Sequence, residues 1–337
     1  MAKQTKTGVL IERVATSWVQ RHRAESQSTD WGQTLLMSGL LSTLRHHETP
    51  AVRKYLQTWL RFHMNERLYV HYFCGSWSPG LLFPQVYEEF PELQLQLRDS
   101  AERIYQFIDS KALRNGDGII LHNVDLPNIY IDTVYFTAPV MQKLGTFLGL
   151  PWQDEAIMQI LLHLERLQDG AKPFYIHCEE NLAGLRSEGS WARGNGWVMM
   201  TLVEILPHLQ KSSPAYKDLK GRFQVLALAL SEHQTKNGLW RTILDDRTSY
   251  EETSASAMYL FAFVRARKLG ILGSEYDKVI ERAYQGLAKH VDRKGVFTGT
   301  SEGTWPGTVE YYKSLKTGEW WWGTGSYLLA LTEYDTW

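Results

Sequence analysis

The spacing of apolar residues constrains the fold of this 337-residue chain more than any other feature. Almost no stretch alternates apolar and polar residues for long enough to predict a half-buried strand. Apolar residues recur instead at positions i, i+3, i+4 and i+7, which is the pattern of amphipathic helices. Twelve segments follow this pattern, over residues 9–23, 31–44, 52–62, 80–87, 93–108, 132–148, 153–167, 191–209, 215–233, 251–268, 276–290 and 320–334. The sequence therefore predicts an all-α protein.

Polar segments rich in Gly and Trp precede every second predicted helix. They read STDWGQ, CGSWSPG, NIYIDT, EGSWARGNGW, RTSYEETSAS and GEWWWGTGS, and they recur roughly every 45 to 70 residues, a period typical of repeated helical hairpins. Six hairpins closed into a ring, an (α/α)6 barrel, would aim the starts of the inner helices into one cavity. An open α-solenoid would explain the period, but not why Trp, Asp, Arg and Glu recur at one end of alternate helices.

Composition narrows the classes of function. No linker or shift in composition divides the chain, so we expect one domain over residues 1–337. Because 36 Lys and Arg balance 37 Asp and Glu, we expect no nucleic-acid partner. No apolar run approaches the roughly 18 residues of a membrane span, so we expect no membrane association. Only Cys74 and Cys178 are present, and Glu12 and Arg13 interrupt the first apolar stretch, which predicts a cytoplasmic protein without a cleaved signal peptide.

The motifs of several enzyme classes do not occur in this sequence. The eleven histidines form no HxH or HExxH pattern of a metal site. There is no Walker-type loop for a nucleotide and no serine nucleophile elbow. Asp245 and Asp246 are not followed by the third acidic residue that a prenyl-diphosphate metal site would need. We therefore expect no metal ion and no other cofactor.

Asp132 is the most informative carboxylate, because it begins a predicted helix among the apolar and aromatic residues of IYIDTVYFTAPVMQKLG. One interpretation is a helix cap. The other is a general acid, since an apolar setting raises the pKa of a carboxyl group and lets it hold a proton near neutral pH. A helix N-terminus lowers the pKa, so the two influences oppose each other.

A second candidate region is HCEENLAGLRSEGSWARGNGWVMMTLVEIL, which places Trp191, Arg193 and Trp197 around a glycine-rich helix start. An arginine offers a planar fork for a carboxylate, and a helix N-terminus adds amide donors. Two indoles would supply flat faces for a sugar ring. The alternative is an arginine stacked between tryptophans for packing alone. His177 lies just upstream on a predicted loop, either as a site residue or as a surface histidine.

Two further inner-helix starts carry residues that packing alone can also explain. In YEETSASAMYLFAF, Glu251 or Glu252 is a candidate second acid, and helix capping is the simpler interpretation. In WWWGTGSYLLALTEY, three adjacent tryptophans cannot all be buried on one helix face. We expect at least one of these rings to line a cavity or a lid.

Four motifs together resemble a known family. DTVYFTAPVMQKLG, SWARGNGWVMMTLVEIL, SYEETSASAMYLFAF and WGTGSYLLALTEY are similar, in order and spacing, to the unsaturated rhamnogalacturonyl hydrolases of glycoside hydrolase family 105. They are more distantly similar to the unsaturated glucuronyl hydrolases of family 88. The resemblance covers residues 120–334 well and the first hundred residues only by pattern. It implies an (α/α)6 barrel, in agreement with the hairpin pattern.

The resemblance also implies a reaction. The substrate is an oligosaccharide whose non-reducing end is a 4,5-unsaturated uronic acid, left there by a polysaccharide lyase. An acid protonates C4, water adds at C5, and the resulting hemiketal opens and releases the next sugar. Asp132 matches the family's acid, which in this reading also activates the water. The positions that match the family's substrate-binding pocket are Trp31, by pattern only, and His177, Trp191, Arg193 and Trp197.

The chain departs from the family in one place. The family usually carries a second aspartate near the start of the fourth helix, where this chain reads HYFCGSWSPG and has no carboxylate between His71 and Tyr87. Either another acid, Glu251 or Glu252, takes that role, or Asp132 works with fewer helpers.

Three other functions fit the same sequence pattern. A conventional inverting glycosidase would hold two carboxylates about 6.5–9.5 Å apart across the bond, for instance Asp132 with Glu251 or Glu252. A sugar epimerase or isomerase would use inward-facing histidines of the same barrel and release no second sugar. A saccharide-binding or scaffold protein would leave its ligand unchanged.

Overall fold

The computed structural model describes residues 5–65, 68–125 and 127–337. All twelve predicted helical segments are present. The helices are α1 (Lys6–Arg21), α2 (Trp31–His46), α3 (Pro50–His63), α4 (Phe83–Glu89), α5 (Gln94–Ser110), α6 (Asp132–Leu148), α7 (Gln153–Leu167), α8 (Ala192–Ile205), α9 (Pro214–His233), α10 (Thr253–Lys268), α11 (Asp277–Ala288), α12 (Val309–Ser314) and α13 (Trp321–Asp335). The short α12 was not predicted.

Short elements connect these helices. Among the described residues, five 3-10 helices occur: η1 (Ala24–Ser26), η2 (Cys74–Leu81), η3 (Pro91–Leu93), η4 (Leu206–His208) and η5 (Ser274–Tyr276). The same part of the chain contains six strands of two residues each: β1 (Ile129–Tyr130), β2 (Cys178–Glu179), β3 (Trp240–Arg241), β4 (Glu251–Glu252), β5 (Thr300–Ser301) and β6 (Thr317–Gly318). They pair antiparallel as β1 with β2, β3 with β4 and β5 with β6. In each pair, one strand lies just before an inner helix, since β1 precedes α6, β4 precedes α10 and β6 precedes α13. The pairs therefore join other loops to the starts of these helices.

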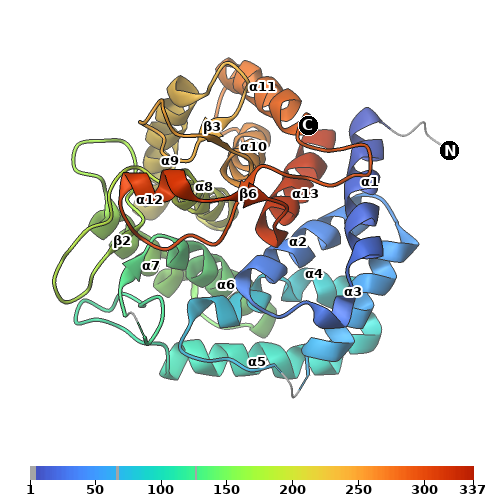
Figure 1. Ribbon diagram of the computed structural model, residues 1–337. Coiled ribbons are helices and arrows are strands. Elements are labelled where there is room, and N and C mark those ends of the chain that lie inside the picture. Colours follow the sequence, from blue (N-terminus) through green and yellow to red (C-terminus); the bar gives the residue numbers. More distant parts are fainter. Residues whose placement is uncertain (1–4, 66–67, 126) are drawn as a thin grey trace.

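Alternate helices form a closed inner ring. Around it, α2 packs against η2, η2 against α6, α6 against α8, α8 against α10, α10 against α13, and α13 against α2 again. The helices α1, α3, α5, α7, α9 and α11 surround this ring. In Figure 1 the blue α1 lies beside the red α13, so the two ends of the chain meet where the ring closes. The predicted (α/α)6 barrel is confirmed.

Inner and outer helices differ in how much of their surface is apolar. Thirteen of the sixteen residues of α10 are buried, on all of its sides. In α11 only Ile280, Ala283, Gly286 and Leu287 are buried, which is one stripe of a twelve-residue helix. A helix that is apolar all round needs neighbours on every side, whereas a single stripe needs one. The distribution of polar residues therefore assigns each helix to its layer.

Glycines let the ring close between its first and last members. A Cβ atom on Gly39 of α2 would lie 2.5 Å from the carbonyl oxygen of Gly325 of α13, and 3.0 Å from its Cα. Only a residue without a side chain permits such an approach of two backbones. The glycine in each of these helices therefore serves the packing of α2 on α13, although glycine weakens an isolated helix.

The buried apolar side chains form one continuous cluster, with members from α1 through α13. This core supports our proposal that residues 1–337 form a single domain, of which residues 1–4, 66, 67 and 126 lie outside the described part. Within the described residues, no helix has both the length and the apolar character required to cross a membrane.

Candidate active site

The starts of several inner helices enclose a cavity of about 340 Å³ at one end of the barrel. This volume lies within the range of roughly 300–1,000 Å³ that is typical of small-molecule sites. The lining residues are Asp30, Trp31, Phe73, His122, Asn123, Tyr130, Asp132, Phe136, His177, Gly303, Thr304 and Trp305. Aromatic rings, two carboxylates and two imidazoles thus face one space.

Asp132 lies at the first turn of α6, yet its side chain does not cap that helix. Its Oδ1 accepts a hydrogen bond of 3.0 Å from Nε1 of Trp197, and its Oδ2 lies 3.3 Å from Nε2 of His177. Both contacts come from other segments of the chain. The carboxylate is therefore held in place by its neighbours and remains in contact with the cavity.

The short pair of β1 and β2 brings His177 to Asp132. Tyr130 is paired with Cys178, and the Ile131 amide donates to the His177 carbonyl over 2.9 Å. Ile131 directly precedes Asp132, and Cys178 directly follows His177. A ladder of two residues on each strand thus joins side chains that are 45 positions apart.

His177 is part of a chain of hydrogen bonds. Its Nδ1 lies 3.1 Å from the hydroxyl of Tyr312, and that hydroxyl accepts a bond of 3.1 Å from the Gly307 amide. Burial lowers the pKa of His177, although Asp132 opposes this. In the neutral ring the hydrogen belongs on Nε2, because an ionised carboxylate only accepts. Tyr312 then donates to Nδ1 and fixes this tautomer.

The carboxyl group of Asp132 is surrounded by donors. Burial by itself would raise its pKa, but the close contact with His177, with the charge of Arg193 as a smaller influence, holds the pKa below its ordinary value. Trp197 also donates, so both close contacts favour the ionised form. The pKa of Asp132 is thus lowered by side chains from other segments, whereas the sequence suggested only the helix N-terminus as the lowering influence.

The predicted tryptophans occupy two different positions. Trp31 lines the cavity, and its ring stacks on Trp322 with centroids 4.8 Å apart. Trp191 and Trp197 are fully buried behind the wall. Trp191 stacks on His177 at 3.9 Å, and Trp197 holds Asp132. The flat faces that the sequence suggested for these two indoles are covered by protein, so they do not face the cavity.

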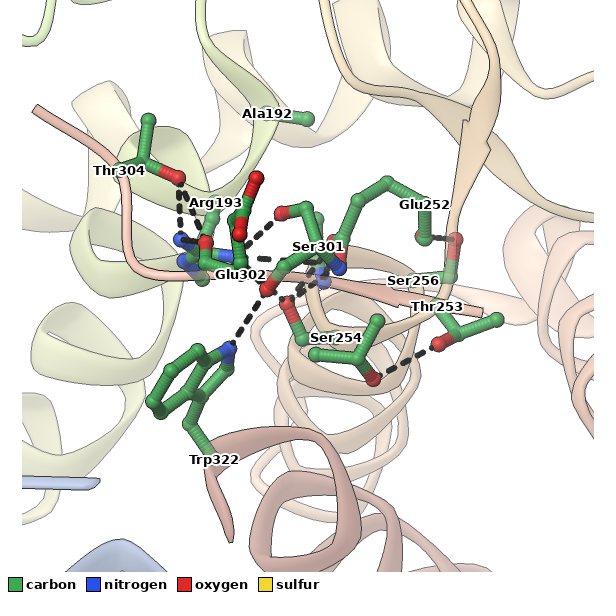
Figure 2. A network of polar contacts seen from close by, with 12 residues as sticks. Ala192, Arg193, Glu252, Thr253, Ser254, Ser256, Ser301, Glu302, Thr304 and Trp322 are labelled. Atoms are coloured by element: carbon green, nitrogen blue, oxygen red, sulfur yellow. Dashed lines mark hydrogen bonds and ion pairs between the residues drawn. The ribbon is translucent and has the colours of Figure 1, made fainter. Parts of the chain in front are cut away.

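Arg193 also lies behind the wall, in the polar network of Figure 2. Its Nη1 donates to Oγ of Ser301 over 2.6 Å, and its Nη2 donates to the Glu302 carbonyl over 3.1 Å and to Oγ1 of Thr304 over 2.6 Å. Thr304 in turn lines the cavity. Arg193 therefore holds the segment from Ser301 to Thr304 in position, and its charge lies one side chain away from the cavity.

Neither candidate second acid lines the cavity. Glu252 is buried, caps α10 through the Ala255 amide at 2.7 Å, accepts from the Ser301 amide at 2.8 Å, and lies 3.8 Å from Nη1 of Arg193. Glu251 accepts from Asn237 at the surface. The capping interpretation is thus confirmed for Glu252. The suggestion that one of these two carboxylates faces Asp132 is wrong. The two residues are adjacent in β4, so their side chains point to opposite sides: Glu252 toward Arg193 and Ser301, and Glu251 toward the surface.

Some cavity residues were not identified from the sequence. His122 stacks on Tyr130 with centroids 4.1 Å apart, and burial lowers its pKa to about 4. Trp305 lies in an exposed loop. Asp30 is the N-cap of α2 and was not identified as a site residue from the sequence. The available signal was its position in STDWGQ, a segment at the start of an inner helix like that of Asp132.

A scan against protein families matches residues 8–337 to the model described as Glycosyl Hydrolase Family 88. The chain belongs to glycosyl hydrolase family 88. This membership confirms the resemblance read from the four sequence motifs, and it extends the match to the first hundred residues.

Curated relatives of this family 88 chain share part of its length. It is 28% identical over 214 residues to the unsaturated rhamnogalacturonyl hydrolase YesR of Bacillus subtilis, which covers 61% of this chain and 60% of that protein. It is 31% identical over 152 residues to an unsaturated 3S-rhamnoglycuronyl hydrolase of Formosa agariphila, covering 42% of this chain and 38% of that protein. The matched part of the chain thus spans less than two thirds of these relatives.

Solved structures share the fold over the whole family 88 chain. A possible member of family GH105 from Klebsiella pneumoniae superposes with a TM-score of 0.90 at 22% identity, covering 99% of this chain and 94% of that one. The unsaturated glucuronyl hydrolase of Bacillus sp. GL1 superposes with a TM-score of 0.76 at 17% identity, covering 99% and 97%. Both likenesses support the helical barrel.

Proposed function

We propose that this protein is a glycosidase that removes a 4,5-unsaturated uronic acid from the non-reducing end of oligosaccharides made by polysaccharide lyases. The observation that carries this proposal is the setting of Asp132, an ionisable group held by His177 and Trp197 in an aromatic-lined cavity. The names of the curated relatives, which are hydrolases of unsaturated sugars, support the same substrate class.

The proposed reaction is a hydration of the C4=C5 vinyl ether. A proton is added at C4, and the oxygen of a water molecule bonds to C5 as the water loses a proton. The C5 hemiketal then opens by breaking its bond to the ring oxygen, and the hemiacetal left at C1 releases the next sugar as an alcohol. Asp132, ionised by its two donors, takes the proton from the water.

The uronate carboxylate needs a positive environment. Arg193 supplies it, since its charge is felt at Asp132 and its guanidinium lies directly behind Thr304. In our proposal Thr304 and Gly303 contact the substrate, and Arg193 stabilises the anion either through the Thr304 hydroxyl or by direct contact once substrate displaces that hydroxyl. Trp31 provides the aromatic wall beside the sugar ring.

A neighbouring cleft of about 420 Å³ suits the next sugar of an oligosaccharide. It shares Tyr130 and Trp305 with the Asp132 cavity, so the two spaces adjoin. Trp305 is 59% exposed, and Arg186 and Glu188 also line the cleft. An exposed indole between two cavities offers a stacking face to a sugar that spans both.

The experiment that tests this function uses a panel of oligosaccharides made by lyases, each ending in an unsaturated uronic acid. We expect ultraviolet absorbance of the double bond to fall in step with release of the next sugar. An epimerase would release no sugar, and a binding protein would leave the absorbance unchanged. Either result with every member of the panel would contradict the proposal.

The cellular setting belongs to the same proposal. The sequence predicts a cytoplasmic protein that acts on a small oligosaccharide, with neither a nucleic acid nor a membrane as partner. Cys74 and Cys178 are both buried and free. Uptake or production of short lyase products inside the cell would then have to precede this reaction.

A further inference from the structure

A second carboxylate, Asp30, lines the cavity that contains Asp132. It precedes α2, and its Oδ1 accepts a bond of 2.6 Å from the Trp31 amide. Within the described part of the chain, its Oδ2 has no hydrogen-bond donor. One oxygen of Asp30 thus caps the helix, and the other is left for the cavity.

Asp30 reaches this place because Gly75 leaves room for it. A Cβ atom on Gly75 would lie 2.5 Å from Oδ1 of Asp30 and would collide with the Phe73 ring. Gly75 belongs to η2, the second element of the inner ring, where the sequence has no carboxylate between His71 and Tyr87. Asp30, at the start of α2, therefore places a carboxyl group against η2, which has none of its own.

We propose that Asp30 is a second catalytic carboxylate, which delivers the proton to C4 of the unsaturated uronate while Asp132 takes a proton from the water that adds at C5. The proposal rests on the function proposed above. The step conserves atoms. One water is consumed: its hydroxyl bonds to C5 and its remaining proton goes to Asp132, while Asp30 gives one proton to C4. The protein therefore loses one proton and gains one. No oxidant, metal or cofactor takes part.

The surroundings of the two carboxyl groups suit this division of roles. Burial raises the pKa of Asp30, and the Trp31 amide and the charge of His71 offset this only in part. The pKa of Asp132 is lowered. When two neighbouring acids have pKa values moved in opposite directions, the group with the higher pKa holds the proton and the other acts as base. The titratable groups around Asp30 are His71, Cys74, His122 and Asp132.

The central test is Asp30→Asn. Asparagine caps helices as well as aspartate does, so α2 should keep its start and the melting temperature should change little. The variant cannot donate the proton, and acid–base groups typically contribute about 10²–10⁴-fold in rate. We expect kcat on the unsaturated oligosaccharide to fall by at least about 100-fold.

The pH dependence separates catalysis from capping. In the parent, kcat/KM should fall as pH rises through the raised pKa of Asp30, because the acid form is lost. It should also fall as pH decreases through the lowered pKa of Asp132. Asp30→Asn should lose the alkaline limb and keep the acid limb. A rate within tenfold of the parent, or a lower rate with the alkaline limb unchanged, would overturn the proposal.

Two further variants complete the experiment. Asp30→Ser also caps a helix, and it replaces Asp30→Asn if that protein does not fold. Ser213→Ala removes a cap from α9, where the Ser213 hydroxyl accepts from the Tyr216 amide over 3.1 Å, away from the cavity. We expect it to lower the melting temperature and to leave kcat unchanged. If the parent itself does not bleach the substrate, the proposed function and this inference both fail, whereas an active parent with an active Asp30→Asn overturns only the inference.

Discussion

Asp132 and Glu252 are two carboxylates at the starts of two inner helices, and they differ in what their oxygens contact. Glu252 receives hydrogen bonds from two backbone amides and a hydroxyl and lies against Arg193. Asp132 has two side-chain partners, Trp197 and His177, and reaches the cavity. A carboxylate whose lone pairs are all occupied stabilises the fold, whereas one with remaining capacity in a cavity is able to react.

The two residues were hard to tell apart in the sequence for the same reason. Both stand at the start of an apolar helix, beside aromatic or small residues. Burial and position therefore do not distinguish a cap from an acid. What distinguishes the two residues is the kind of group that a distant segment brings to the carboxylate. At Glu252 it is the backbone amide of Ser301 in β5, and at Asp132 it is the side chain of His177, next to β2.

The largest effect expected from this comparison is on catalysis. Asp132→Asn removes the proton acceptor but keeps the shape of the side chain and its bond from Trp197. We expect kcat to fall by about 10²–10⁴-fold, as is typical of acid–base groups. The melting temperature should remain close to that of the parent. Retention of kcat within tenfold, measured by loss of absorbance, would assign Asp132 a structural role.

The same chemical change at Glu252 should act on stability instead. Glu252→Gln leaves Arg193 buried without its counter-charge. It also places the NH2 group of glutamine, a donor, among the backbone amides that donate to Glu252 in the parent. Removing one partner of a buried ion pair typically costs about 3–5 kcal/mol. Chemical denaturation should show a loss of that order. If Glu252→Gln were as stable as the parent and as inactive as Asp132→Asn, the comparison would be wrong.

A smaller effect is expected at Arg193, whose charge interacts with both carboxylates. Arg193→Lys keeps the charge but loses the planar fork that reaches Ser301 and Thr304 together. We expect KM to rise by roughly tenfold and kcat to change less, because the loss affects binding of the uronate. Steady-state kinetics measures both values. An unchanged KM would show that the guanidinium acts only in packing.

The smallest effect concerns the support of Asp132. Tyr312→Phe removes the hydroxyl that fixes the His177 tautomer while keeping the ring. One neutral hydrogen bond contributes about 1 kcal/mol, so we expect kcat/KM to fall by about fivefold. An increase in kcat/KM would contradict this arrangement. The matched control is Tyr334→Phe, since the Tyr334 hydroxyl donates to Glu281 over 2.6 Å and makes no contact with His177.

The helical framework could be predicted because it depends on local spacing of apolar residues. Helices α6 and α7 begin and end at the predicted residues. The six residues of α12 are too few for a periodic pattern to be visible. The helix η2 begins before the predicted segment, over CGSWSPG, where Gly and Pro disfavour helix in isolation and packing against α6 provides the support.

The site could be predicted only in part, because its contacts join distant segments. Asp132 and His177 were named from sequence, yet the strand pair that joins them has two residues a side and leaves no pattern. Ser301, Glu302 and Thr304, which accept from Nη1 and Nη2 of Arg193, lie more than 100 residues further along the chain, so the sequence could not show that these two nitrogens are already engaged. Asp30 was not identified as a site residue, because the sequence around a helix start does not show whether a side chain faces a cavity.

The most direct test of the account uses a matched pair of oligosaccharides that differ only in the C4=C5 double bond. Both are incubated with the parent protein, and the released sugar is quantified for each. We predict release from the unsaturated compound, in step with the loss of its ultraviolet absorbance, and no release from the saturated one. Comparable cleavage of the saturated compound would show direct displacement at the glycosidic carbon and would contradict hydration as the reaction.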